Sequence, residues 1–417
     1  MLKRLSIGQK LHVAGQLPLM TLLALAAIAG RAAADAPPAA PPQSPVPQSP
    51  IPQSSAPQLS DLLDASGIAV TGYVDGTYEH LSTTGEFKSG VPSRVFDFHE
   101  DSFTVHQAAF TVASQPKEGF GGVVNVTAGT DADVIKSYPL TGGSDFDLTQ
   151  AFVQYAHGSL TVMGGKFVTL AGVEVINETQ DTNFSRSILF GYAIPYTNTG
   201  VRAVYAIGDQ FGVTLGINNG WDQITAANNG KTGEFGLTWT PSKAFSAVMD
   251  AYAGKEPVDV ATRLQNTERD LVDVILTWSA TDRATFIVNY DWARQQQAAA
   301  DGAAARWDGI AAYFNYQLTE RWRTSLRLET FDDRDGYRTG VDAPEPGVPA
   351  AHRGQTWSEA TLTGGYAPSK HAEIRFEVRA DKSNVPDAFV AAGDPTTGSA
   401  TLTGRAESEA LQALFKF

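Results

Sequence analysis

The sequence of 417 residues contains no cysteine, and its acidic residues outnumber its basic residues, 45 to 31. A chain without cysteine gains nothing from an oxidising compartment, although it is not excluded from one. The net charge of −14 excludes a general nucleic-acid-binding protein, which needs a basic face. After Ala34 no apolar run is long enough for a transmembrane helix, so the rest of the chain can cross a membrane only as a closed β-barrel.

Residues 1–34 have the pattern of a secretory signal peptide. Basic residues, including Lys3 and Lys10, precede an apolar run at 17–29, which is too short for an ordinary transmembrane helix. Ala32, Ala33 and Ala34 supply an A-x-A cleavage site. Cleavage there removes four basic residues and no acidic one, which moves the net charge from −14 to −18. An uncleaved membrane anchor is the alternative.

Residues 35–66 are expected to form a disordered tether rich in Pro, Gln and Ser. A pentapeptide register, PQSPV, PQSPI and PQSSA, begins at residue 42. A segment with so few apolar side chains cannot bury enough surface to fold, so an extended spacer is predicted. A proline-rich recognition peptide is the alternative.

Strands with one apolar and one charged face dominate the chain from residue 67 to residue 417. In residues 372–381, Ile374 and Phe376 alternate with Arg375 and Glu377. Successive side chains of a strand point to opposite faces, so this segment has a dry side and a charged side. One such strand also fits the surface of a soluble β-sandwich, which is the competing fold.

Sixteen segments of this kind are predicted, most of them of the length that a tilted strand needs to cross a bilayer. They are 67–80, 94–114, 119–130, 146–157, 159–167, 199–207, 211–219, 231–240, 244–254, 269–279, 284–294, 306–317, 321–331, 355–366, 371–381 and 406–417.

The connections between these segments alternate in length. Short turns such as 241–243 and 318–320 alternate with long connections, of which 81–93, 168–198, 255–268 and 332–354 are examples. Outer-membrane barrels have short periplasmic turns and longer external loops, whereas a soluble sandwich has no reason to separate loop lengths in this way. The fold class predicted is therefore all-β, a 16-stranded antiparallel up-and-down transmembrane β-barrel.

Aromatic side chains on the apolar faces support a membrane barrel. Each lies close to a short turn and in phase with the aliphatic residues of its own strand: Trp239, Phe245, Trp278, Tyr316, Trp322 and Tyr366. This placement predicts an aromatic girdle at a membrane–water boundary. The last strand ends in an apolar alternation on Phe415 and Phe417, which resembles the C-terminal assembly signal of outer-membrane barrels.

No local motif indicates catalysis, a cofactor or a metal site. Gly230-Lys231-Thr232 lacks the upstream glycine of a P-loop, since position 225 is threonine. The acidic clusters beginning at Asp131 and Asp332 do not complete an EF-hand spacing. The histidines show no ligand spacing, so a barrel hydrolase is a minor alternative.

The third long connection, 168–198, is not simply hydrophilic. Phe184, Ile188, Phe190 and Tyr192 are poor residues for a solvated external tip. A long loop in a compact domain is usually functional, and the position after the fifth strand matches the constriction loop of 16-stranded porins, which folds into the lumen. A lid packed on the rim or an oligomer contact is the alternative.

The chain resembles the beta-barrel porin-2, OmpL-like family. The resemblance rests on motifs in order along the chain: Gly129-Thr130-Asp131, Gly164-Gly165-Lys166-Phe167, Asn183-Phe184-Ser185-Arg186-Ser187, Pro195, Thr199-Gly200-Val201-Arg202 and Asn219-Gly220-Trp221-Asp222. The family more often has histidine in a T-H-T-G segment, where this chain has Thr197-Asn198-Thr199-Gly200. The resemblance implies an outer-membrane porin without naming its solute.

We therefore expect a non-enzymatic porin in the outer membrane of a Gram-negative-type bacterium, a passive pore for small hydrophilic solutes or ions. The expected partners are outer-membrane lipid, the barrel assembly machinery and the solutes, with a homotrimer by analogy and no nucleic acid. A plugged structural or adhesive barrel is the alternative. Selectivity would follow from the bore and its lining charge.

The alternation also predicts which charged side chains face the lumen. The expected pore lining is Lys166, Arg202, Asp250, Asp273, Asp291, Glu329, Glu373 and Glu377. The expected constriction places loop residues Glu174, Glu178, Asp181 and Arg186 opposite Arg321, Arg323, Arg327, Arg375 and Arg379. In a 16-strand cylinder the strand opposite the fifth is the thirteenth, so an acidic loop would face a basic wall, with a transverse field between them.

Overall fold

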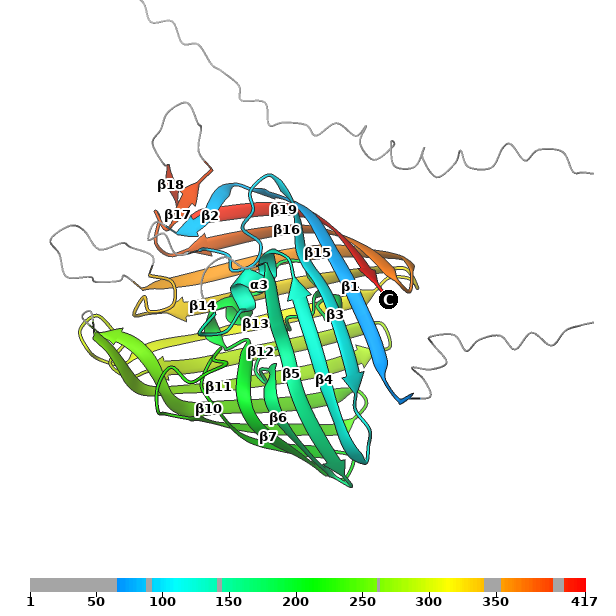
Figure 1. Ribbon diagram of the computed structural model, residues 1–417. Coiled ribbons are helices and arrows are strands. Elements are labelled where there is room, and N and C mark those ends of the chain that lie inside the picture. The colour runs from blue at the N-terminus through cyan, green and yellow to red at the C-terminus, as the bar shows by residue number, and fades with distance from the viewer. Residues whose placement is uncertain (1–65, 88–91, 141–144, 261–262, 341–353, 393–400) are drawn as a thin grey trace, which may run out of the picture. The chain divides into compact units, whose positions relative to one another are not determined.

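The computed structural model describes residues 66–87, 92–140, 145–260, 263–340, 354–392 and 401–417, and it shows a closed β-barrel (Figure 1). Sixteen antiparallel strands follow one another in chain order, and the first, β1, pairs with the last, β19. The predicted fold class and strand number are confirmed. The predicted signal peptide and all but the last residue of the predicted tether lie outside the described residues, and both stay predictions.

The barrel strands are β1 (Ala69–Leu81), β3 (Ser102–Ser114), β4 (Gly119–Ala128), β5 (Phe146–His157), β6 (Leu160–Val168), β7 (Thr197–Ile207), β8 (Phe211–Asn218), β9 (Thr232–Ser242), β10 (Phe245–Val260), β11 (Arg263–Thr281), β12 (Ala284–Gln295), β13 (Ala305–Gln317), β14 (Trp322–Asp333), β15 (Gln355–Ser369), β16 (Ala372–Ser383) and β19 (Arg405–Lys416). Three short strands, β2 (Thr83–Phe87), β17 (Phe389–Ala391) and β18 (Leu402–Thr403), form a separate small sheet. The helical segments are α3 (Thr130–Ile135), η1 (Glu178–Gln180) and η2 (Leu189–Ala193), and no described helix is long and apolar enough to span a membrane.

The strands turn their apolar faces outward and their charged faces inward. In β16, Ile374 is 44% exposed and Phe376 54%, whereas Arg375 is 1% and Glu377 2% exposed. A soluble sandwich would bury the apolar face and solvate the charged one, because apolar burial drives its folding. The reversed arrangement fits a barrel whose outer surface contacts lipid.

The predicted aromatic girdle lies beside the short turns. Trp278 and Trp322 are half exposed on the outer surface, and the ring of Trp322 lies 4.6 Å from that of Tyr366 on the neighbouring strand. At the seam of the barrel, the backbone N–H of Gly72 donates to the carbonyl of Phe417 at 3.1 Å, and the N–H of Phe417 donates back at 2.9 Å. These bonds extend the β1–β19 ladder to the last residue.

One strand prediction was wrong at its start: the strand expected at 94–114 begins only at Ser102. The preceding residues fold into the barrel, where Phe96 is 4% exposed and its ring lies 5.7 Å from that of Phe190. Arg94 donates to Asp97 and Asp381 at 2.7 Å each. These contacts with distant residues outweigh the local alternation that suggested a longer strand.

The prediction of a long connection at 255–268 was also wrong. Strands β10 and β11 continue through most of it in one register, in which Lys255 pairs with Glu268 and Glu256 with Thr267. An opposite-charge pair directly across an antiparallel ladder stabilises the hairpin, so this charged segment is strand rather than loop.

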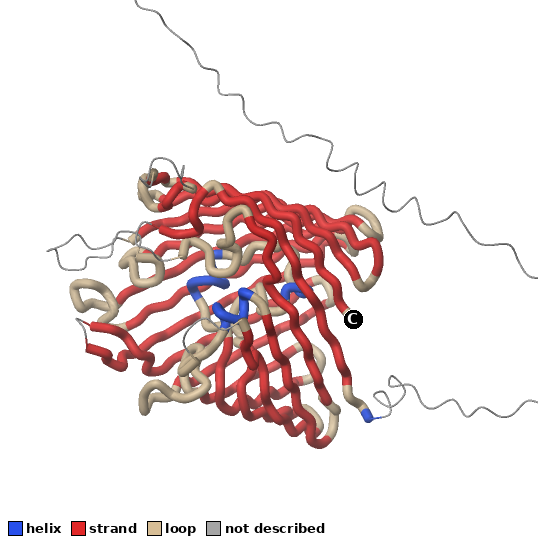
Figure 2. The backbone as a smooth tube through the Cα atoms, turned by 45° about the horizontal axis from the view of Figure 1, so that its top comes forward, coloured by secondary structure: helices blue, strands red, loops and turns tan. Residues whose placement is uncertain are grey.

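The buried apolar core combines inward-facing strand residues with residues of the loop and helical segments that Figure 2 shows inside the barrel. Large inward-facing side chains such as Trp307, Phe331 and Trp357 are at most 1% exposed, because segments of the long loops cover them. The ring of Trp357 lies 5.9 Å from that of Tyr192 and 5.2 Å from that of Phe87. Part of the lumen is therefore filled by packed apolar side chains.

Candidate functional site

The segment 169–196, which we call the inner loop, leaves β6 and crosses the lumen. It contains η1 and η2, and Ile188, Leu189 and Phe190 in it are at most 2% exposed. The inner loop is bonded to inward-facing residues of β14, β15 and β16 on the far wall. The structure thus places it in the lumen, as predicted, and not on the rim.

The arginine at the centre of the far wall anchors the inner loop. Arg327, on β14, is fully buried and donates from Nη1 to Glu174 at 2.7 Å and to the carbonyl of Ser185 at 2.6 Å. Its Nε donates to Glu359 of β15 at 3.0 Å. A buried guanidinium needs several acceptors to offset its lost hydration, and both the loop and the wall supply them.

Two carboxylates on the far wall of the barrel accept hydrogen bonds from backbone N–H groups of the inner loop. Glu377 accepts from Phe184 at 2.7 Å and from Ser185 at 2.9 Å, and Glu329 accepts from Ile188 at 2.6 Å. Backbone donors taken out of water need such partners, and ionised acceptors make the stronger bonds. These two predicted lining residues therefore serve as docking points for the loop.

A second arginine fixes the tip of the inner loop. Arg375 donates to Glu178 at 2.6 Å and to the carbonyl of Asp181 at 2.8 Å. Within the loop, Arg186 is bonded to Glu178 and lies 2.8 Å from Asp181. Arg379 donates to the carbonyl of Arg186 at 2.7 Å. Acidic loop and basic wall meet in direct ion pairs, and the transverse field expected between them stays a prediction.

The remaining two arginines of the expected constriction behave differently. Arg323 donates to Glu373 and to the carbonyl of Thr182 at 2.6 Å each, so it touches the loop. Arg321 is exposed in the short turn before β14 and has no ion-pair partner among the described residues. That any of these side chains limits solute passage stays a prediction.

The inner-loop carboxylates are held in different electrostatic states. Burial works to raise the pKa of Glu174, but the guanidinium groups of Arg327 and Arg186 outweigh it and lower that pKa below its usual value. Burial raises the pKa of Asp181 well above its usual value in spite of Arg186. Glu174 is therefore the ionised partner that ties the loop to Arg327.

Two further predicted lining residues lie in inward-facing ion pairs. Lys166 is 3.1 Å from Asp147 on the neighbouring strand, and the Nε of Arg202 is 2.6 Å from Glu234. Sequence reasoning named the cations and missed both carboxylates. Asp147 lies on the same face of β5 as Ala151, the residue opposite Lys166, and this shared phase was the only sequence signal for it.

Three predicted lining residues form a row of carboxylates. Asp250, Asp273 and Asp291 lie directly opposite one another on β10, β11 and β12, and glycines 236 and 309 flank the row. All three are at most 2% exposed, and none has an ion-pair partner in the part of the chain that the structure describes. Asn289 donates to Asp273 at 2.5 Å, and both carboxylate oxygens of Asp291 are without a hydrogen-bond partner.

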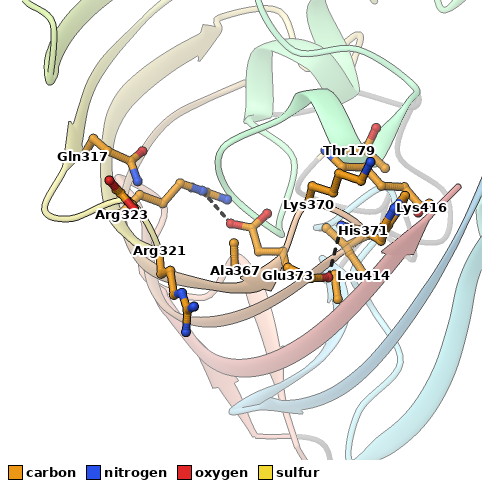
Figure 3. Close-up of a pocket in the computed structure, with 13 residues that line it drawn as sticks. Thr179, Gln317, Arg321, Arg323, Ala367, Lys370, His371, Glu373, Leu414 and Lys416 are labelled. Atoms are coloured by element: carbon orange, nitrogen blue, oxygen red, sulfur yellow. Dashed lines mark hydrogen bonds and ion pairs between the residues drawn. The ribbon is translucent and has the colours of Figure 1, made fainter.

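A cavity of about 290 Å³, the short-turn cavity, lies beneath the tip of the inner loop (Figure 3). It is lined by Thr179, Gln317, Glu320, Arg321, Arg323, Ala367, Ser369, Lys370, His371, Ala372, Glu373, Leu414 and Lys416. Apart from Arg321, Arg323 and Glu373, its charged residues were not predicted as site residues, because they lie at turns and at the end of β19 rather than inside a strand.

Comparison with known proteins places this geometry in a family. The sequence profile of the beta-barrel porin-2, OmpL-like family matches residues 67–407. OprB of Pseudomonas putida is 12% identical, with a TM-score of 0.57 over 86% of this chain and 96% of OprB. The outer membrane channel DcaP of Acinetobacter baumannii is 14% identical, with a TM-score of 0.54 over 84% of this chain and 97% of DcaP.

OmpT of Vibrio cholerae, solved in a trimer form, is 11% identical, with a TM-score of 0.53 over 84% of this chain and 99% of OmpT. No curated protein sequence matches the chain. At these identities the solved structures show the shared fold, whereas the family profile spans nearly the whole barrel. The chain therefore belongs to the beta-barrel porin-2, OmpL-like family and is a porin channel of the bacterial outer membrane.

Proposed function

We propose that this porin allows passive diffusion of small hydrophilic solutes or ions, and that the inner loop sets the width of its path. The observation that carries the proposal is the inward-facing charged surface of β14–β16, to which the loop is bonded through Arg327 and Arg375. A loop fixed at several points across the lumen narrows the bore without needing to move. Selectivity then follows from bore and charge, and no catalytic step is required.

A plugged barrel is the second candidate, and the apolar cluster in the lumen favours it. Trp307, Phe331 and Trp357 are covered by long-loop segments, so any path must run beside this cluster. We infer a narrow channel of small conductance rather than a sealed one, because the opposite end of the barrel contains the short-turn cavity.

The assembly and its surroundings follow from the same proposal. The outward apolar faces fit outer-membrane lipid, and insertion would use the barrel assembly machinery. OmpT of Vibrio cholerae was solved in a trimer form, and by analogy we propose a homotrimer for this chain.

Single-channel recording in a planar bilayer tests the pore. The purified protein should give discrete conductance steps, and Trp357→Ala should enlarge them by removing a ring that packs against Tyr192 and Phe389 in the lumen. Trp322→Ala is the matched control, because Trp322 is 50% exposed on the outer surface and contacts Tyr366. A folded, heat-modifiable barrel that never conducts would support the plugged alternative instead.

A further inference from the structure

The short-turn cavity is a built space between the inner loop and the barrel wall. Figure 3 shows Gln317, Arg321 and Arg323 on one side of it, Thr179 of η1 with Lys370, His371 and Lys416 on the other, and Ala367 and Glu373 between them. An adjoining cavity of about 370 Å³ shares Thr179, Lys370, His371 and Lys416 and extends to β1 and Phe417. Together they form the space that a solute meets between the inner loop and the short-turn side of the membrane.

The charge of the short-turn cavity is opposite to that of the chain. Arg321, Lys370 and Lys416 contribute three cations, and none of them has an ion-pair partner among the residues that the structure describes. They come from three separate segments: the turn before β14, the turn before β16 and the end of β19. The whole chain carries a net charge of −14, so this concentration of positive charge is local.

The carboxylates of the short-turn cavity do not cancel this charge. Glu373 lies 2.6 Å from Arg323 and 3.1 Å from Arg375, so it is shared between two guanidinium groups. Glu320 is the other acid of the lining. Arg323, whose Nε and Nη1 are bonded, keeps a buried Nη2 without a partner. Neither carboxylate pairs with Arg321, Lys370 or Lys416, so their charge is left for a ligand.

We propose that the short-turn cavity binds small anions that carry two or more negative charges, such as inorganic phosphate or a short dicarboxylate. Guanidinium groups bind the paired oxygens of phosphate and carboxylate, and ammonium groups add point charge from the other side. Three cations on separate segments can contact several oxygens at once, which a monovalent ion does not need. The site rests on the proposed pore, because solutes would reach it through the lumen or from the periplasm.

Because of where the cavity lies, the anion concentration needed for block should depend on the side of the membrane to which the anion is added. Short turns of outer-membrane barrels face the periplasm, so the cavity is reached directly from that side. From the other side an anion must first pass the inner loop. A dianion bound beneath the loop should obstruct the path of chloride, and it should do so at lower concentration when added on the periplasmic side.

The test uses the full mature protein in a planar bilayer with chloride as the permeant ion and phosphate or succinate added to one side, with acetate as the monovalent comparison. Lys370→Gln with Lys416→Gln should raise the half-blocking concentration of the dianions about 10-fold, which corresponds to about 1.4 kcal/mol. The matched control is Lys117→Gln with Lys243→Gln, two exposed lysines on other short turns, and it should leave the block unchanged.

Equal effects of the two lysine pairs, or equal block by acetate, would overturn the site and indicate only diffuse charge on the rim. Titration calorimetry of the detergent-solubilised protein with phosphate separates the site from the pore. If phosphate gives a heat of binding that is lost in the Lys370→Gln/Lys416→Gln variant, but the protein never conducts, the site is supported and the pore is refuted. Conductance without such heat would refute the site and leave the pore standing.

Discussion

Replacing Asp291 by Asn should stabilise the barrel, which is unusual for a fully buried residue. Asp291 faces Asp273 directly across the β11–β12 ladder, and no basic side chain of the described residues lies within ion-pair distance of either. Residues opposite each other in an antiparallel ladder are about 5 Å apart. At that distance two ionised carboxylates would repel each other by about 3 kcal/mol at an effective dielectric constant of about 20, and avoiding this repulsion requires one of them to take up a proton at a similar cost near neutral pH.

Asparagine keeps the shape of the side chain, removes the cost of either repulsion or protonation, and offers an N–H to Asp273, whose Oδ1 has no hydrogen-bond partner. We therefore expect Asp291→Asn to raise the free energy of unfolding by about 1–3 kcal/mol. The measurement is the urea midpoint of the barrel in lipid vesicles, followed by tryptophan fluorescence and by gel mobility without boiling.

The same exchange at Asp147 is the matched control. Asp147 is also fully buried on the inward face, but it lies 3.1 Å from Lys166, so Asp147→Asn leaves an unpaired ammonium and should cost about 3–5 kcal/mol. A lower urea midpoint for Asp291→Asn would refute the reasoning, because it would mean that the carboxylate row has a stabilising partner such as a bound cation.

Three further predictions concern the inner loop and the barrel seam. Arg327→Met should destabilise the folded barrel by about 3–5 kcal/mol, because it leaves buried carboxylates unpaired, while Arg321→Met should change the urea midpoint little. Phe417→Ser should lower the yield of heat-modifiable barrel, because the ring of Phe417 packs on Gly72 at the seam. The control is Phe103→Ser, since Phe103 is 86% exposed near a long loop, and equal yields of the two variants would contradict this role of Phe417. Acid should enlarge the single-channel conductance only once the pH falls below the ordinary pKa of a glutamate. The lowered pKa of Glu174 gives stability that is present above the ordinary pKa and lost as the pH falls through the folded value, so enlargement at a pH above the ordinary pKa would show that another group holds the loop.

The alternation of apolar and polar residues was sufficient to predict the barrel, because it shows for each strand which side chains face outward. The inward placement of Arg327 and Glu329 follows from their phase with Leu328 alone. Counting strands also placed the fifth barrel strand, β6, opposite the thirteenth, β14, and the inner loop that follows β6 does reach β14.

The partners of these charges could not be predicted, because they are set by contacts between distant segments. Phase shows that Arg327 faces inward but not that Glu359, on the next strand, shares it with the inner loop. Residues 94–101 alternate like a strand, yet Arg94 and Phe96 make better contacts inside the barrel. The local sequence pattern shows on which face of a strand a charged side chain lies. Which opposite charge it pairs with depends on contacts that form only in the closed barrel.

The anchoring of the inner loop has a consequence for the order of folding. The loop belongs to the first half of the chain, but its partners Arg327, Arg375 and Glu377 belong to the last quarter, 142 to 197 residues later. While those strands are missing, Arg186 is the one basic side chain within the loop, and the acidic side chains that Arg327 and Arg375 would pair with must stay hydrated. Docking of the loop is therefore expected to be a late step, coupled to the joining of β1 and β19, and a barrel that has not yet closed should remain wide and sensitive to protease at residues 169–196.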